Sequence, residues 1–278
     1  MPELPEVETV RRGLQHLITG FRISAAHDLH PRALKPESIA PLHTLNGAKI
    51  TGTNRRGKFM WITLNRPYVL VAHLGMSGQF LIHQKDRPKA THIRAQFQLK
   101  KPLRNLELVF NDQRTFGWLS IEELTNNVPT SAQHIAPDPF DPLFDRGATA
   151  KNYLRRNIKI KTALLHQEIM SGVGNIYADE ILHRAGLRWN RTADSLTNPQ
   201  VRRLAQHISE VLHDAIAAGG STLDDSQYVD IDGKTGSFQA EHRVYGRDGK
   251  RCVTCGKADI VRVVAAGRAT AYCPRCQK

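Results

Sequence analysis

The sequence predicts an α+β protein with two domains, and three observations lead to this fold class. Helical spacing of apolar residues at the N-terminus gives way to closely set strand patterns between about residues 48 and 123. Helical periodicity returns between about residues 147 and 218. Four cysteines follow near the end, in a spacing typical of a small metal-bound hairpin. A chain of 278 residues is long enough for about two domains.

The composition indicates a globular protein with a polyanionic partner. The hydrophobic fraction of 40% and the charged fraction of 23% exclude a fibrous repeat and long disorder. The chain carries 39 basic and 26 acidic side chains, a net charge of +13, and its isoelectric point is near 9.9. Nucleic acid is favoured over an anionic membrane because no amphipathic basic helix stands out. No run approaches the roughly 18 apolar residues of a membrane helix, and the acidic, proline-bearing N-terminus does not resemble a signal peptide. We therefore expect a cytoplasmic protein.

The first predicted element is a helix over residues 1 to about 20. Apolar side chains recur there at helical spacing, namely Val7, Val10, Leu14, Leu17 and Ile18. Glu3, Glu6 and Glu8 lie in the first turns, where the helix dipole favours negative charge.

Strands are predicted next. Residues 92–99 alternate strictly between polar and apolar, and 59–62, 68–71 and 106–110 are further candidates. Several short strands at close spacing favour a sandwich or a barrel. The Asn- and Pro-rich stretch within 126–146 then indicates a linker.

The third predicted region is helical. Leu196, Val201, Leu204, Ile208 and Leu212 continue the helical pattern before a Gly-, Asp- and Ser-rich stretch, 219–236, that lacks periodicity.

The cysteines form the pattern C-x2-C-x17-C-x2-C, with Cys252, Cys255, Cys273 and Cys276 as its members. Two such knuckles can place four thiolates around one zinc ion, whereas two disulfides are the alternative. Zinc is favoured because there is no secretory signal and no cysteine precedes Cys252. Four protein ligands leave no open position, so the ion would be structural.

Between the two knuckles, residues 260–264 and 270–272 are predicted to form the arms of a hairpin whose tip, 265–269, includes Arg268. An arginine on such a hairpin can contact nucleic acid, or it can belong to a solvated turn.

Four segments, in this order, resemble the formamidopyrimidine-DNA glycosylase family of bacterial base-excision enzymes. They are Pro2-Glu3-Leu4-Pro5-Glu6-Val7-Glu8, Arg55-Arg56-Gly57-Lys58, Gly172-Val173-Gly174-Asn175 with the residues that follow it, and the cysteine hairpin. The similarity extends over essentially the whole chain. It implies an N-terminal helix and β-sandwich (1–125), a linker (126–146), a helix–two-turns–helix domain with a lesion loop (147–239) and a zinc finger (240–278).

The resemblance also implies the catalytic roles. Pro2, exposed by removal of Met1, would be the nucleophile, Glu3 the general acid/base, and Glu6 a supporting carboxylate one turn later. Lys58 would contact the phosphate or leaving group at the lesion and assist elimination, and Arg268 would hold the phosphate of the lesion. From the residues alone, Pro2 and Glu3 are equally ordinary helix-start signals, and the turn at Lys58 is an ordinary solvated basic turn.

Further residues match DNA-contacting positions of the family. Met76, Arg114 and Phe116 would fill the gap left by an everted base, because Met and Phe can wedge between base steps and Arg can read the orphaned partner. By composition alone, Met76 and Phe116 are better explained as core residues. His92 would contact DNA, although a histidine opening a strand is more often structural. Asn175 would cap a helix near Ile176 and bind the flanking phosphate.

Three features depart from the common family pattern. The loop 219–236 is inserted or altered at Asp224-Asp225-Ser226-Gln227, and Asn157 falls where the family often has lysine. In the hairpin, Ala269 and Ala271 stand where Gly and His are common, and the spacing between the two cysteine knuckles is one residue longer than usual.

The resemblance therefore implies a bifunctional DNA glycosylase and AP lyase that removes oxidised purines such as 8-oxoguanine and formamidopyrimidines. Its partner would be duplex DNA with an oxidised base or an abasic site, its cofactor one structural zinc ion, and its state a monomer. Two alternatives remain open: a sister enzyme of the superfamily that acts on oxidised pyrimidines, and a non-catalytic DNA-binding protein.

Overall fold

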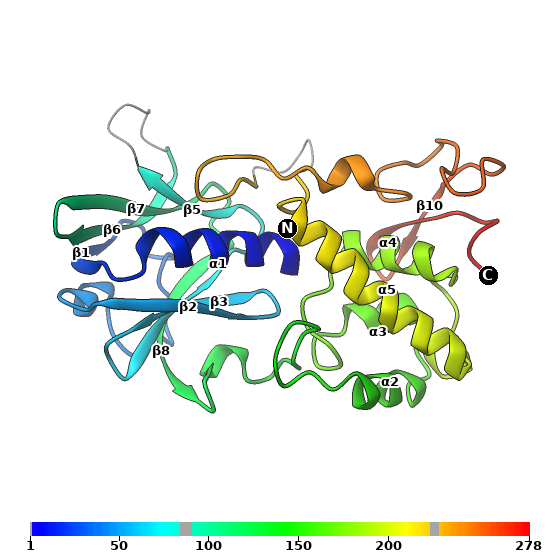
Figure 1. Cartoon of the computed structure of the whole chain (residues 1–278), viewed down its shortest axis with the longest axis horizontal. Helices are drawn as coiled ribbons and strands as arrows, with labels where there is room; N and C mark the ends of the chain where they lie inside the picture. Colours follow the sequence, from blue (N-terminus) through cyan, green and yellow to red (C-terminus); the bar gives the residue numbers. More distant parts are fainter. Residues whose placement is uncertain (1, 84–90, 223–227) are drawn as a thin grey trace. The chain divides into compact units, whose positions relative to one another are not determined.

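The computed structural model describes residues 2–83, 91–222 and 228–278, and it divides the chain into two compact units (Figure 1). The first unit comprises Met1–His134 together with Ala218–Ser237, and the second comprises Ile135–Ala217 together with Phe238–Lys278. The segment 218–237 belongs to the first unit because Tyr228 and Ile231 are buried in its core, although the resemblance placed this segment with the helices of 147–239.

Within its described residues, the first unit contains one long helix and two antiparallel sheets. A four-stranded sheet has the order β1-β6-β7-β5, and a five-stranded sheet has the order β2-β3-β4-β8-β9. The elements are α1 (Leu4–Ile18), β1 (Arg22–Asp28), η1 (Leu42–Leu45), β2 (Ile50–Arg56), β3 (Phe59–Leu64), β4 (Tyr68–His73), β5 (Gly78–His83), β6 (Ile93–Lys101), β7 (Arg104–Asp112), β8 (Trp118–Thr125), β9 (Val128–Pro129) and η2 (Thr130–Ala132).

The core of this unit joins α1 to both sheets. Val7, Val10, Leu14 and Ile18 are almost completely buried, and they share one apolar cluster with side chains from each sheet. Figure 1 shows α1 running alongside β2. The predicted N-terminal helix and β-sandwich are confirmed, and the spacing of the apolar residues explains which face of α1 is buried.

The four predicted strands are present as β3, β4, β6 and β7. Strand β1 lies outside the predicted strand region, and its Ala-containing sequence Arg22–Asp28 carries little β preference. It forms because it pairs with β6 in register from Arg22 opposite Lys100 to Asp28 opposite Ala95.

The second unit contains the predicted helices and hairpin. The elements are α2 (Arg146–Leu154), α3 (Ile160–Leu165), α4 (Asn175–Ala185), η3 (Ala193–Ser195), α5 (Asn198–Ala217), η4 (Phe238–Glu241), β10 (Val261–Ala265) and β11 (Arg268–Tyr272). The hairpin arms are confirmed, and the turn between them is only Ala266–Gly267. Both turn residues have positive φ (48° and 72°), as a two-residue type I′ turn requires.

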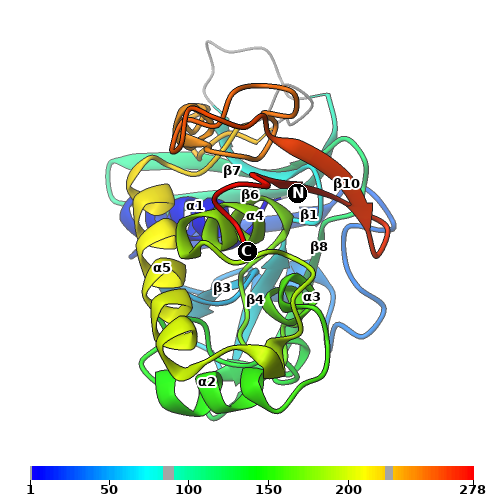
Figure 2. The same ribbon diagram turned by 90° about the vertical axis from the view of Figure 1, so that its right-hand side faces the viewer.

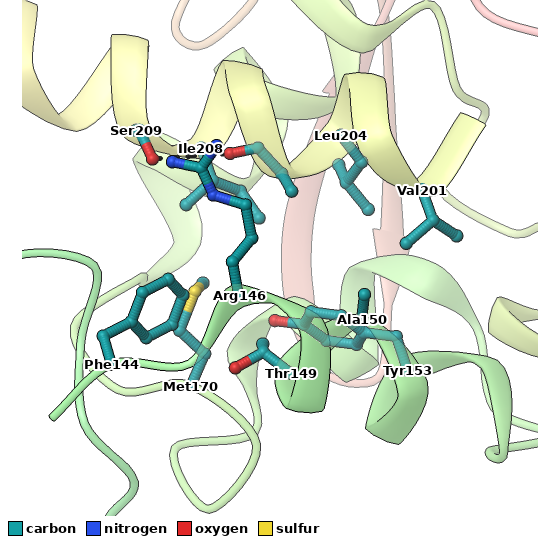
Figure 3. A pocket seen from close by; sticks show the side chains of 11 residues that line it. Phe144, Arg146, Thr149, Ala150, Tyr153, Met170, Val201, Leu204, Ile208 and Ser209 are labelled. Atoms are coloured by element: carbon teal, nitrogen blue, oxygen red, sulfur yellow. Dashed lines mark hydrogen bonds between the residues drawn. The ribbon is translucent and has the colours of Figure 1, made fainter. Parts of the chain in front are cut away.

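Helix α2 packs beside α5 in this unit (Figure 2). Figure 3 shows the side chains of both helices that line a small pocket between them, with Tyr153 of α2 facing Leu204 and Val201 of α5. The Tyr153 side chain is 2% exposed, and its hydroxyl has no hydrogen-bond partner among the described residues. Burial raises the pKa of this hydroxyl above its usual value.

Within the described ranges, no helix has the length and apolar character needed to cross a bilayer.

Candidate functional site

Pro2 and the acidic residues of the first helical turn are held in a buried arrangement. Pro2 is buried, and the Glu3 and Glu6 side chains are 3% and 2% exposed. Glu3 is the N-cap of α1 and forms a capping box with Glu6, whose Oε2 accepts a hydrogen bond from the Glu3 N–H at 2.8 Å. The other carboxylate oxygen of Glu6 accepts a bond from the Ser221 N–H at 2.7 Å. Glu6 therefore ties the start of α1 to the segment that begins the loop 219–236.

Lys58 lies in the two-residue turn between β2 and β3. Arg56 pairs with Phe59, which leaves Gly57 and Lys58 at the turn, and Gly57 adopts a φ of 56° that suits its first position. Beside Lys58 is His73 at the end of β4. Burial, together with the positive charges of Lys58 and Lys35, lowers the pKa of His73 to about 4. His73 is therefore neutral at physiological pH.

His73 also contacts the next candidate segment. Its Nδ1 accepts a hydrogen bond from the Gly75 N–H at 3.2 Å, directly before Met76. Its ring stacks on Trp118 with centroids 5.6 Å apart. The neutral imidazole thus fixes the start of the turn that carries Met76.

The structure brings Met76, Arg114 and Phe116 together on two adjoining turns. Met76 is 39% exposed and Phe116 is 49% exposed, so the alternative that they are core residues is wrong. The Arg114 guanidinium lies 5.0 Å from the centre of the Phe116 ring. The turns touch closely, because a Cβ on Gly75 would lie 2.4 Å from the carbonyl carbon of Phe116. Two exposed apolar side chains and an arginine therefore form one projecting group.

A completely buried carboxylate, Asp112, joins these two turns. Its Oδ1 accepts bonds from the Ser77 hydroxyl and from the Arg114 N–H (3.2 Å), and its Oδ2 accepts from the Gly117 N–H at 2.7 Å. The Ser77 hydroxyl in turn accepts from the Arg114 N–H at 3.0 Å. We refer to Asp112 and Ser77 as the turn clamp.

His92 directly precedes β6 and is only partly buried. Its N–H donates to the side-chain Oδ1 of Asn111 at 3.1 Å, and its carbonyl accepts from the Asp112 N–H at 2.9 Å. The backbone of His92 is thereby fixed next to the turn clamp.

In the second unit, Asn175 and the hairpin tip with Arg268 are joined by one backbone carbonyl. The Ala269 oxygen accepts from Asn175 Nδ2 at 2.9 Å and from Lys161 Nζ at 3.0 Å. Arg268, directly before Ala269, is exposed. The two predicted phosphate contacts thus belong to one rigid group.

A buried ion pair supports this group. Lys161 Nζ lies 2.6 Å from Asp179 Oδ1, and the Asp179 carboxylate also accepts from the Ala271 N–H of the hairpin at 2.9 Å. Burial raises the pKa of Asp179 to about 7, although the nearby Lys161 charge opposes this rise.

The expectation that Asn175 caps α4 is wrong. Gly174 occupies the N-cap position, with φ −123° and ψ −159°, and Asn175 is the first helical residue. The Asn175 amide reaches across to the hairpin and not to its own helix, because the Ala269 carbonyl lies within hydrogen-bond distance.

The four cysteines are gathered at the base of the hairpin. Their Sγ atoms all lie within 4.8 Å of one another, and the pairs Cys252–Cys276 and Cys255–Cys273 are each 3.8 Å apart. A tetrahedral zinc with Zn–S bonds of about 2.3 Å separates its sulfur ligands by about 3.8 Å. The donor set therefore fits one structural zinc ion with no position left open.

The predicted site residues thus fall into two sets, one in each unit. Pro2, Glu3, Glu6, Lys58, Met76, His92, Arg114 and Phe116 belong to the first unit, and Asn175, Arg268 and the cysteines to the second. Sequence reasoning missed the side chains that position these residues, namely Glu8, His73, Ser77, Asp112, Lys161 and Asp179. Most are polar residues within or next to apolar segments. A polar residue in such a place is often buried and hydrogen-bonded, and this pattern could have indicated that these side chains hold other residues in position.

Comparison with known proteins finds one family along the chain. Three family models match in order: the formamidopyrimidine-DNA glycosylase N-terminal domain over residues 1–119, the formamidopyrimidine-DNA glycosylase H2TH domain over 135–227, and the zinc finger found in FPG and IleRS over 249–278. A formamidopyrimidine-DNA glycosylase from Salinispora arenicola is 43% identical over 280 residues, which cover all of this chain and 96% of the relative.

Solved structures agree as well. The MutM (Fpg) protein from Thermus thermophilus is 38% identical with a TM-score of 0.86, and the match covers 99% of this chain and 98% of that one. A Lactococcus lactis Fpg mutant in complex with Fapy-dG containing DNA is 32% identical with a TM-score of 0.86, and each chain is covered completely. The full-length matches in sequence and structure show that this chain belongs to the formamidopyrimidine-DNA glycosylase family, a family of DNA glycosylases with AP lyase activity.

Proposed function

We propose that this member of the family removes oxidised purines from duplex DNA through a Schiff base on Pro2 and then cleaves the strand. The observation that carries the proposal is the buried start of α1, where Pro2 directly precedes the capping box of Glu3 and Glu6. Membership of the family supports the purine-lesion substrate, and so does the similar Lactococcus lactis protein, which was crystallised with Fapy-dG containing DNA.

The chemistry begins at the secondary amine of Pro2 after Met1 has been removed. An α-amine titrates near 7.7–8.0, so roughly a tenth or more is neutral and nucleophilic at pH 7. The nitrogen attacks C1′ of the damaged nucleotide, the glycosidic C1′–N bond breaks, and the base departs with a proton supplied by Glu3. The proton of the Pro2 nitrogen then passes to O4′ as the C1′–O4′ bond opens, and the ring-opened iminium ion that results acidifies the C2′ protons. Loss of one of them breaks the C3′–O bond, and a second elimination breaks the C5′–O bond and leaves a one-nucleotide gap.

The remaining residues would hold the DNA. Lys58, Asn175 and Arg268 contact the phosphates around the lesion, and one of the two Nδ2 protons of Asn175 already fixes it to the hairpin. His92 would make a further backbone contact. Met76, Arg114 and Phe116 enter the space left by the everted base. The zinc ion holds the hairpin that presents Arg268 and takes no part in the reaction.

The residues 224–227, whose sequence departs from the family pattern, lie outside the described residues. By the family resemblance, the loop 219–236 to which they belong would be the lesion loop that covers the everted base. We further propose that the protein acts as a monomer in the cytoplasm, in contact with the nucleoid.

The proposal is tested by borohydride trapping on an 8-oxoguanine:cytosine duplex. Wild-type protein should form a covalent adduct that peptide mapping assigns to Pro2. Pro2→Gly, and a form that retains Met1, should bind the duplex with salt-sensitive affinity but trap far less.

An adduct at another residue would overturn the proposed nucleophile. Trapping on thymine glycol but not on 8-oxoguanine would instead place the protein with the enzymes for oxidised pyrimidines. Tight binding with no adduct on either duplex would indicate a non-catalytic DNA-binding protein.

A further inference from the structure

Glu8, a buried carboxylate on α1, binds three arginines. Its Oε1 accepts from Arg11 Nη2 (2.9 Å) and Arg12 Nε (2.7 Å), and its Oε2 accepts from Arg11 Nε (2.9 Å) and Arg55 Nε (3.0 Å). The side chains of Glu8 and Arg55 are only 10% and 5% exposed. Partners this buried lose little to solvent screening, so the arrangement is much more rigid than a surface ion pair.

Arg55 extends this contact to the turn that carries Lys58. Its Nη1 donates to the Gly57 carbonyl at 3.0 Å. That carbonyl belongs to the peptide unit that joins Gly57 to Lys58, so the bond fixes the plane from which the Lys58 side chain starts. Because this peptide plane is rigid, its orientation decides where the Lys58 Cα–Cβ bond points.

The same carboxylate is also anchored to the neighbouring strand. Arg11 forms two hydrogen bonds to Glu8, and its Nη1 also donates to the Thr53 hydroxyl at 3.3 Å. The Thr53 hydroxyl in turn donates to the Arg11 carbonyl at 3.1 Å. Helix α1 and strand β2 are therefore locked together next to the turn. Arg12 contributes another bond to Glu8, but its side chain is 61% exposed and does not extend the link toward β2.

We propose that Glu8 is a positioning residue that holds Lys58 at a fixed place relative to the start of α1, through Arg55 and the Gly57 carbonyl. Pro2 and Glu3 lie at the start of the same helix, so one buried carboxylate links the helix of the proposed nucleophile to the turn of the proposed phosphate-binding amine. Glu8 keeps the negative charge that this link requires. Burial by itself raises the pKa of Glu8, but the bonds from Arg11 and the charges of Arg55 and Arg11 lower it to about 2. The inference rests on the proposed role of Lys58.

The test is a double-mutant cycle measured by single-turnover excision on an 8-oxoguanine:cytosine duplex. Glu8→Gln keeps the size of the side chain but removes the charge that holds Arg55. Because small displacements of a catalytic group cost up to about 100-fold in rate, Glu8→Gln should lower the rate at least about tenfold. In the Lys58→Met background the same substitution should lower the rate less than about twofold, since the group it positions is already absent.

Arg12→Gln is the matched control. It also removes one bond to Glu8, but it does not touch the link to the turn, so its rate should stay within about twofold of wild type. If Glu8→Gln prevents folding, Arg55→Lys replaces it, because a single ammonium cannot bind both Glu8 and the Gly57 carbonyl in the geometry of a guanidinium.

Equal losses in the Lys58 and Lys58→Met backgrounds would overturn the proposal, because they would show that Glu8 acts independently of Lys58. A wild-type rate for Glu8→Gln would also overturn it. If Lys58→Met itself excised at the wild-type rate, the proposed role of Lys58 would fail, whereas borohydride trapping at Pro2 would still decide the overall reaction separately.

Discussion

The turn clamp gives the sharpest test of how the first unit presents Met76, Arg114 and Phe116. Asp112 is completely buried, and its two oxygens accept from the Ser77 hydroxyl and from two backbone N–H groups. Asp112→Asn preserves the shape, but it replaces one acceptor oxygen with an NH2 group that must face a donor.

The expected cost follows from these bonds. A hydrogen bond to a charged acceptor contributes about 1.5–3 kcal/mol, and an unpaired buried donor costs about 1–3 kcal/mol, so Asp112→Asn should lower the free energy of unfolding by about 2–4 kcal/mol. For a unit of this size, that corresponds to a fall in Tm of about 5–15 °C. If the two turns loosen, single-turnover excision should fall about 10- to 100-fold.

Asp145→Asn is the control, with thermal unfolding and excision measured in parallel. Asp145 is the exposed N-cap of α2 and accepts from the Ala148 N–H at 2.9 Å. Because Asn caps helices as well as Asp does, this variant should unfold within about 0.5 kcal/mol of wild type. An Asp112→Asn protein that melts within about 1 °C of wild type and excises at the same rate would refute the reasoning.

Three further outcomes are expected. Tyr153→Phe should leave the free energy of unfolding unchanged or raise it by about 1 kcal/mol, whereas Tyr68→Phe, which removes the bond to the Thr44 carbonyl, should lower it by about 0.5–1.5 kcal/mol in the same chemical-denaturation assay. His73, with its pKa lowered from 6.5 to about 4, binds its proton more readily in the unfolded chain, so stability should decrease as pH falls from 6.5 to 4, by about 2–3 kcal/mol in all. Thermal melts of His73→Phe should lack that component of the pH dependence, and an unchanged slope would contradict the assignment. Removing zinc by chelation, or by Cys273→Ser, should release the hairpin and weaken duplex binding in fluorescence anisotropy, with metal content measured in parallel.

The strongly patterned parts of the fold could be predicted from the sequence. The apolar spacing in α1, the alternation that became β6 and the cysteine spacing each reflect a local rule that tertiary contacts did not override. Strand β1 could not be predicted, because pairing with β6 and not its own residues determines it. The place of 218–237 in the first unit depends likewise on the burial of Tyr228 and Ile231 by residues far away in the chain.

The candidate site divides in the same way. Motif residues such as Lys58, Asn175 and Arg268 could be named from the sequence because they match motifs of a known family, although their local patterns alone fit ordinary turns and caps. The residues that fix them could not, because Glu8 meets Arg55 and Lys161 meets Ala269 only after the chain has folded. Asn175 shows what local rules cannot predict. Its position before a helical segment indicated a helix cap, but in the fold its amide donates to the carbonyl of Ala269, 94 residues later in the chain.

The shared carbonyl at the hairpin tip has a consequence for how this sequence can change. Asn175 and Lys161 bind the main-chain oxygen of Ala269 and not its side chain, so almost any residue type at this position can offer the same acceptor. Replacement of the common glycine by alanine there leaves the two contacts intact. Protein engineers can therefore vary position 269 to alter the surface around Arg268 while the anchoring of the arginine stays constant.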